Sequence, residues 1–469
     1  MQASPSDHIF SNPYLMALGY IALGGLLLLA FIFYQERTLF TDIPYQTVLM
    51  INEGKVQVQV FRFGAAIVQL LPLLAIKLEL PISTILTLYS ISFPLLYLFI
   101  FILIVHPLKN PRLGWALIFL FTLIIFDGFY WPSSEQQQGL AFLLLFFAVV
   151  LRFPALKGLF LWVGLVIGLL AIAYYHPLIF IPFYFLMVFF GWSQKNLQHR
   201  NFLLLGLLLF LILVLKSQFS SNYYDDGKYT VFFNNLIDYF PNYFSFPSHQ
   251  KFLQHSLKFW YFLPLLFTVV MLFYTYHRKW LKAALVVTFC FGTLLLLHIG
   301  SPKASYRFYA EVNYMPLVIF LAVPFLFDIV PTIRSPKWVL LLFAIIIGIR
   351  LNTIYHNHRP FTQRIQWLQQ TINSESTQLK TNRLWMYEWD TPKEQLIMSW
   401  STAYETLLLS SIDGPAHSKT LVIFPEVGPT RLQQLQTDSL FHSAIRMHSV
   451  EEFNPKYFQI NQGPYMQIK

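Results

Sequence analysis

Residues 83–106 read STILTLYSISFPLLYLFIFILIVH, a run of 24 residues without an aspartate, glutamate, lysine or arginine. A helix of this length is about 36 Å long at about 1.5 Å per residue, and the hydrocarbon core of a bilayer is about 30 Å thick. Similar apolar runs follow one another closely from Tyr14 to Tyr355. The sequence therefore predicts a polytopic helical membrane protein.

The chain has 469 residues, of which 56% are hydrophobic and only 12% are charged, whereas about a quarter of the residues in a soluble protein are charged. We expect about eleven spanning helices, which we place at residues 14–34, 83–106, 113–130, 136–151, 158–175, 177–192, 201–216, 259–276, 281–298, 314–331 and 338–354. Segment 61–80 contains Arg62, Lys77 and Glu79, which are costly in a spanning helix. We expect it to lie half embedded at one surface.

After residue 355 the composition changes to a mixed polar sequence, so we predict a membrane domain over 1–355 and a soluble domain over 356–469. The second region alternates strand-like segments (383–391 and 419–426) with helix-like segments (392–412 and 429–442). This alternation predicts a small α/β unit. The fold class is thus an all-α membrane domain followed by a small α/β domain.

The net charge of +10 resides entirely in the membrane region, because residues 356–469 hold ten basic and ten acidic side chains. The loops 107–112, 152–157, 193–200, 277–282 and 332–337 are basic and contain no acid. The positive-inside rule places them and the amino terminus in the cytoplasm, and the carboxy-terminal domain outside it. Orientation signals account for the excess of positive charge, so nucleic acid is not an expected partner.

The acids of the membrane region gather on the opposite, outer face, in loops 35–82, 217–258 and 299–313 and at outer helix ends. Asp42 or Thr41 can cap a helix that contains Pro44 and ends at Gly54, with an apolar face that we expect on the membrane surface. Asp42 and Glu135 are candidates to take a proton from a hydroxyl group, as is Asp127.

Basic and aromatic residues accompany these acids. Arg307, with Lys303, Tyr306 and Arg62, could hold a phosphate group, since the guanidinium fork matches phosphate oxygens. Arg307 and Arg350 could equally extend toward lipid headgroups. His176 and Glu311 are candidates to contact substrate or to ligate a divalent ion, with a capping role as the alternative for His176. Aromatic residues of the same loops suit sugar stacking or the membrane interface; they are Tyr130, Trp131, Tyr174 and Tyr309.

The first 140 residues resemble the GT-C superfamily of membrane glycosyltransferases, which includes protein O-mannosyltransferases and the aminoarabinose transferase of lipid A. One helix is followed by an outer loop with an early acid, ERTLFTDIPYQ (36–46), and by a juxtamembrane segment that ends in LLPLLAIKLELP (70–81). A helix pair around the basic turn HPLKNPR (106–112) then leads to a second acidic loop, FDGFYWPSSEQ (126–136).

The resemblance implies transfer of a sugar from a polyprenyl-phosphate donor to a lipid, glycan or protein acceptor, at the outer face of a membrane that we expect to be the bacterial inner (plasma) membrane. The first-loop acid of the family matches Asp42, and the second-loop acid falls at Asp127 or Glu135. A divalent cation, Mg²⁺ or Mn²⁺, is a cofactor that this chemistry admits. Asp42 is followed by Ile43 rather than by a second acid, and RFGAA (62–66) replaces the KPP-like motif of many relatives.

Two other classes of function are also compatible with the sequence. A transporter or flippase of a lipid-linked or anionic solute would place charges near the middle of the membrane and would contain broken helices in two related halves. A non-catalytic membrane scaffold would use the carboxy-terminal region to bind a partner.

Overall fold

The computed structural model describes residues 7–194, 196–220, 222–303, 306–437 and 439–468, and 72% of these residues are helical. Six helical segments are long and apolar enough to cross a membrane: α2 (Pro13–Ile32), α6 (Ile82–Val105), α11 (His199–Phe219), α15 (Trp280–Gly300), α16 with the turns that follow it (Arg307–Thr332), and α17 with α18 (Pro336–Leu379). The prediction of a helical membrane protein is therefore confirmed, whereas the number of eleven spans stays a prediction.

The other predicted spans are also helical, but shorter. They are α7 (Pro111–Thr122), α8 (Glu135–Arg152), α9 (Leu159–Tyr175), α10 (Phe180–Ser193) and α14 (Phe262–Tyr276). Segment 61–80 forms the short helix α5 (Ala66–Lys77), which at about 18 Å is too short to cross the hydrocarbon. Helix α13 (Pro247–Lys258) meets α14 at an angle of 87°.

Helix α7 ends at Thr122 rather than near residue 130, because side chains of distant helices bind the backbone groups that would otherwise continue the helix. Arg350 Nε donates to the carbonyl oxygen of Thr122 at 2.7 Å. The Glu311 carboxylate accepts from the backbone N–H groups of Phe126 and Gly128 at 2.9 and 2.7 Å. These contacts turn the chain into the loop 123–134, which carries the candidate acid Asp127 and leads to Glu135 at the start of α8.

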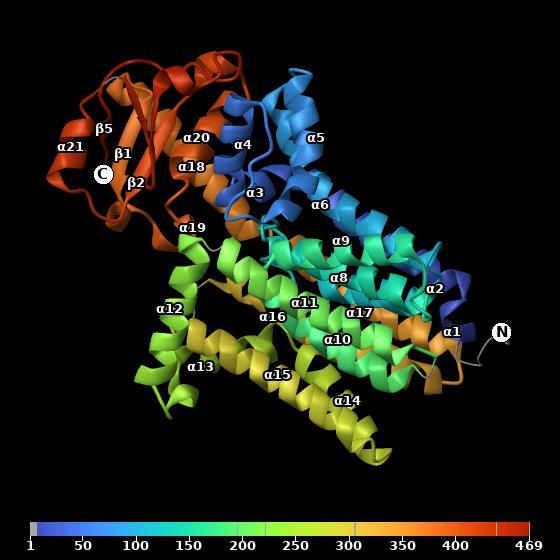
Figure 1. Cartoon of the computed structure of the whole chain (residues 1–469). Coiled ribbons are helices and arrows are strands. Elements are labelled where there is room, and N and C mark those ends of the chain that lie inside the picture. Colours follow the sequence, from blue (N-terminus) through green and yellow to red (C-terminus); the bar gives the residue numbers. More distant parts are fainter. Residues whose placement is uncertain (1–6, 195, 221, 304–305, 438, 469) are drawn as a thin grey trace.

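The long helices lie side by side, with the amino terminus and α1 (Asp7–Phe10) at one end of the bundle (Figure 1). The opposite end carries α4 (Asp42–Glu53), α12 (Tyr223–Asp238) and the sheet of the carboxy-terminal region (Figure 1). Helix α4 begins and ends where the sequence predicts, with Thr41 at its N-cap and Gly54 in the left-handed conformation after it.

The carboxy-terminal region contains a three-stranded parallel sheet in the order β2-β1-β5, formed by β1 (Arg383–Tyr387), β2 (Thr420–Phe424) and β5 (Met466–Gln467). An antiparallel pair follows, β3 (Leu440–His442) with β4 (Met447–Ser449). The helices of this region are α18 (Arg359–Leu379), α19 (Lys393–Leu396), α20 (Thr402–Ser411) and α21 (Pro429–Gln434). Strands and helices thus alternate as predicted.

Three expectations for the helices were wrong. In the predicted helix 429–442, only α21 is helical, and residues 440–442 form the strand β3. The predicted helix 392–412 is broken between α19 and α20, where Ile397 has a φ of 58°. The apolar face of α4 does not lie on the membrane surface: its members Ile43, Val48, Leu49 and Ile51 are buried inside the protein. Helix α20 packs against α4 and covers it.

Candidate functional site

Asp42 is the first residue of α4, and its carboxylate faces the second outer loop. Its Oδ2 accepts hydrogen bonds from Trp131 Nε1 at 2.9 Å and from Ser133 Oγ at 3.2 Å. The hydroxyl of Thr41 lies 3.5 Å from the same oxygen. Asp42 therefore does more than cap its helix, and it ties the two loops singled out in the sequence to one another. We call Thr41, Asp42, Trp131 and Ser133 the Asp42 site.

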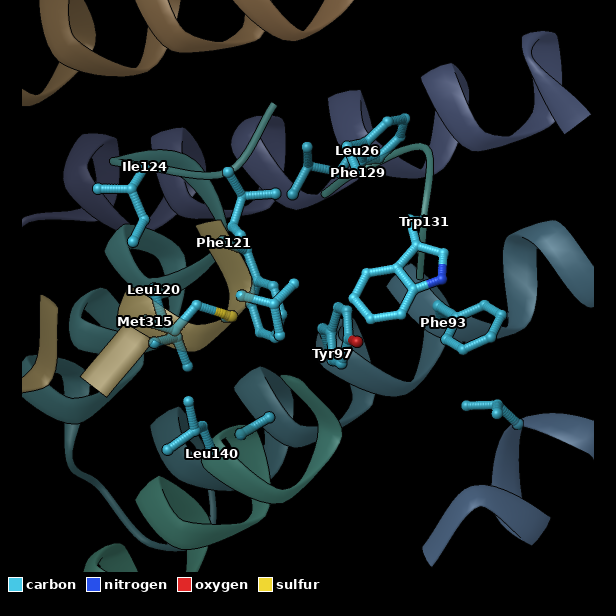
Figure 2. Close-up of a cluster of buried hydrophobic side chains, with 14 of the residues drawn as sticks. Leu26, Phe93, Tyr97, Leu120, Phe121, Ile124, Phe129, Trp131, Leu140 and Met315 are labelled. Carbon is cyan, nitrogen blue, oxygen red and sulfur yellow. The ribbon is translucent and has the colours of Figure 1, made fainter. Parts of the chain in front are cut away.

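Trp131 is fixed by apolar packing on its other side. Its ring lies among buried side chains that include Phe93 and Tyr97 (Figure 2). Tyr309 meets it edge-on at a centroid distance of 4.5 Å. Tyr130 and Trp131 are buried within the protein, so the interfacial position considered for them from the sequence is wrong.

The carboxy-terminal region holds Thr41 in place. The backbone N–H of Thr41 donates to Glu405 Oε1 at 3.1 Å, and Glu405 forms a fully buried ion pair with Arg364 of α18. Thr41 has a φ of 54° and a ψ of −115°, a conformation that is strained for a β-branched residue. Glu405 therefore stabilises the backbone that aims the Asp42 carboxylate.

Arg62 joins two acids from other parts of the chain. Its Nη1 lies 3.1 Å from Glu135 Oε2 and its Nη2 lies 3.0 Å from Asp225 Oδ1. All three side chains are only 12% to 13% exposed. We call these three residues the Arg62 cluster. Asp225 was not a candidate from the sequence, although Asn222 caps α12 just before it.

Arg307 pairs with the other candidate acid of the second loop. Its Nε and Nη2 both contact the carboxylate of Asp127, the latter at 2.7 Å, and Asn357 donates to the same carboxylate. Glu311 lies one turn along α16 and is completely buried, 3.9 Å from Arg307 Nε. These four residues form the Arg307 cluster. Its guanidinium lies over the rings of Phe126 and Phe259, at 4.8 and 4.6 Å.

Arg350 does not extend toward lipid headgroups as considered from the sequence. It is fully buried, donates to the carbonyl oxygens of Thr122 and Phe259, and lies 5.3 Å from the centre of the Phe126 ring. Arg307 is 24% exposed and is bound to Asp127. The two arginines thus hold the second loop and its neighbours together.

Burial and charge shift the pKa values of the acids. Burial raises the pKa of Asp42, and the hydrogen bonds from Trp131 and Ser133 partly offset this rise. Burial also raises the pKa of Glu135. The charge of Arg62 lowers this pKa, and the charge of Asp42 raises it.

The remaining candidates make none of these contacts. His176 Nδ1 accepts from the backbone N–H of Leu178 at 3.3 Å, so it has the capping role that was the alternative to ligation. Lys303 is exposed on the turn before α16, and Tyr306 is 40% exposed and stacks on Phe308. Within the described ranges, no three or more histidine, cysteine or acidic side chains form a group that could hold a metal ion.

The arrangement combines a carboxylate of raised pKa with two arginines held by acids. The carboxylate can accept a proton from a bound hydroxyl group. The guanidinium groups can exchange a carboxylate for a phosphate. Each of these anions presents two oxygens that accept hydrogen bonds from paired N–H donors. No family model, curated protein or solved structure matches this chain, so its function has to be inferred from these residues.

Proposed function

We propose that this protein is a membrane glycosyltransferase that moves a sugar from a polyprenyl-phosphate-linked donor to an acceptor hydroxyl at the outer face of the membrane. One observation carries the proposal. The Asp42 carboxylate of the first loop is held by Trp131 and Ser133 of the second loop, and Glu135, which directly follows that loop, binds Arg62. An acid and a phosphate-binding cation are the two groups that this reaction needs.

Asp42 acts as the general base. Its carboxylate takes the proton of the acceptor hydroxyl as the hydroxyl oxygen forms a bond to the anomeric carbon of the sugar. The bond between that carbon and the phosphate oxygen breaks, and polyprenyl phosphate leaves with the electron pair. A pKa raised by burial makes Asp42 a stronger base than an exposed aspartate.

Arg62 and Arg307 stabilise the charge that develops on the leaving phosphate. Each is held by a carboxylate in the structure, Glu135 or Asp127, so the donor phosphate would take over part of this pairing on binding. Preorganised guanidinium groups cost little reorganisation during the reaction. No step requires a metal ion in this scheme.

The variant Asp42→Asn tests this assignment. It keeps the shape of the side chain but removes the base, so transfer should fall by at least about a hundredfold, with unchanged membrane insertion. The matched control is Asp226→Asn, which changes an exposed acid of α12 in the same way. Full activity of Asp42→Asn would rule out the role of this residue as base.

A second candidate is transport of an anionic or lipid-linked solute. It is favoured by the fully buried Arg350 within a spanning helix and by the 87° break between α13 and α14. Arg350 is, however, committed to two backbone carbonyl groups. A transporter would move an intact donor across the membrane, whereas a transferase splits it.

A further inference from the structure

A basic hollow lies at the end of the bundle opposite the Asp42 site. It has a volume of about 430 Å³ and is lined by Trp192 at the end of α10, by the turn residues Arg278 and Lys279, and by Trp280, Leu281 and Lys282 in the first turn of α15. Trp192 and Trp280 are 52% and 59% exposed. Indole rings with one apolar and one wet side favour the membrane–water interface.

The charges of this hollow have one sign. Arg278 and Lys279 are exposed. The Nζ of Lys282 donates to Asp328 Oδ2 at 2.7 Å and to Ser193 Oγ at 2.8 Å. None of the described residues that line the hollow is acidic. Its exposed cations are therefore suited to a ligand that carries negative charge.

The ligand must also cover the exposed apolar side chains beside the cations. Leu281 in the hollow is 71% exposed, and the neighbouring helix faces expose Leu272 and Phe291 by 65% and 57%. A free inorganic anion would leave these surfaces and the indole rings without a partner. A lipid covers them with its acyl chains while its headgroup meets the cations.

A second hollow repeats this chemistry. It has a volume of about 480 Å³, and its lining includes His106, Lys109 and Arg112 around the turn between α6 and α7. Its described lining is likewise free of acids. Two basic hollows thus lie in turns that the sequence assigns to the same face.

We propose that the hollow around Arg278 and Lys279 binds the phosphate headgroup of an anionic membrane lipid. The guanidinium and ammonium groups bind the phosphate oxygens, the two indole rings flank the headgroup, and the acyl chains lie along α14 and α15. This site does not depend on the proposed transferase activity.

Native mass spectrometry of the full-length protein tests the proposal, with phosphatidylglycerol and phosphatidylcholine added in equal amounts. The wild type should retain phosphatidylglycerol preferentially. Arg278→Gln/Lys279→Gln should bind it at least about tenfold more weakly, because each basic residue near a membrane surface contributes appreciably to anionic-lipid binding. The matched control is Arg334→Gln/Lys337→Gln, which removes the same charge from another exposed basic loop outside both hollows.

Unchanged retention in the control, together with loss in the Arg278→Gln/Lys279→Gln variant, would support the site. Equal retention of the two lipids by the wild type would overturn it, and so would equal losses in both variants, which would indicate a general charge effect. Inorganic phosphate at millimolar concentration provides the last arm. Full displacement of the lipid by phosphate would contradict a lipid site and assign the hollow to free phosphate.

Discussion

Thr41 is the residue on which the geometry of the site depends most. Its strained backbone is held by a hydrogen bond to Glu405, a residue 364 positions further along the chain. A side chain of the carboxy-terminal region thus fixes the residue next to the proposed base. This region is therefore part of the candidate site and more than an attached module.

Variants of the buried ion pair separate stability from positioning. Glu405→Leu leaves Arg364 buried without its counter-charge and should lower the free energy of unfolding by about 3–5 kcal/mol. The double variant Arg364→Leu/Glu405→Leu removes both charges and should recover much of this loss, yet Thr41 still lacks its acceptor. Hydrogen exchange of a peptide that covers Thr41 should then be faster than in the wild type, and transfer should be slower.

The exposed Glu426 supplies the matched control, Glu426→Gln, in which neither exchange nor thermal unfolding should change. Wild-type protection of Thr41 in the double variant would show that Glu405 does not position this residue.

Ser133→Ala tests the protonation state of Asp42. The hydrogen bond from Ser133 lowers the pKa of Asp42, so its removal should raise that pKa further. A base works only when deprotonated, and a higher pKa leaves more of it protonated at low pH. The acid limb of the pH profile of kcat/KM should therefore move to higher pH. An unmoved limb, with transfer otherwise intact, would mean that another group titrates.

At the scale of single elements, close packing at Gly64 keeps the Arg62 cluster in place. A Cβ atom at Gly64 would lie 1.9 Å from a carbon of the Tyr175 ring, so α9 leaves no room for a side chain there. Gly64→Ala should destabilise the protein by about 1–3 kcal/mol and displace the neighbouring Arg62.

Gly227→Ala provides the comparison, because a Cβ atom there meets nothing within 4 Å. This variant lies within α12 and should be neutral or stabilising by up to about 1 kcal/mol. Thermal unfolding of both variants in the same detergent measures the difference. Equal midpoints would indicate that the loop at Gly64 adjusts without strain.

The sequence predicts some elements well because their signals are local. Helix α4 carries its own start and stop, Thr41 and Gly54, and the apolar run 83–106 can only be a long buried or spanning helix. The sequence placed Asp42 and the second loop on the same face but did not predict their contact. The length of the apolar run also explains why the predicted helix 113–130 is too long. The run continues to Phe126, but Glu311 and Arg350, which are distant in sequence, bind the backbone where α7 ends.

Other parts of the site depend on tertiary contacts that a local pattern does not contain. Asp225 joins Arg62 across 163 positions of the chain, and Asn357 joins Asp127 across 230. Glu405 gave a weaker signal, since it is the only charged residue of helix α20. A lone acid in such a helix indicates a buried partner, here Arg364.

At the scale of the whole molecule, the charges divide into two ends. The end that carries α4, α12 and the sheet holds the Asp42 site, whereas the basic loops and both basic hollows lie in turns assigned to the opposite face (Figure 1). A bundle with a paired acid and arginine site at one end and basic loops at the other is suited to chemistry on one side of a membrane. We propose that this chemistry is sugar transfer.

The most direct test follows the fate of the donor. Purified wild-type protein in lipid is incubated with a panel of radiolabelled polyprenyl-phosphate sugars and acceptor-containing membranes, and the lipid products are separated. At least one donor should be split, with release of polyprenyl phosphate and appearance of label in the acceptor. If every donor stays intact, the protein is no transferase of these donors. A donor that crosses the membrane intact would establish the transport alternative in its place.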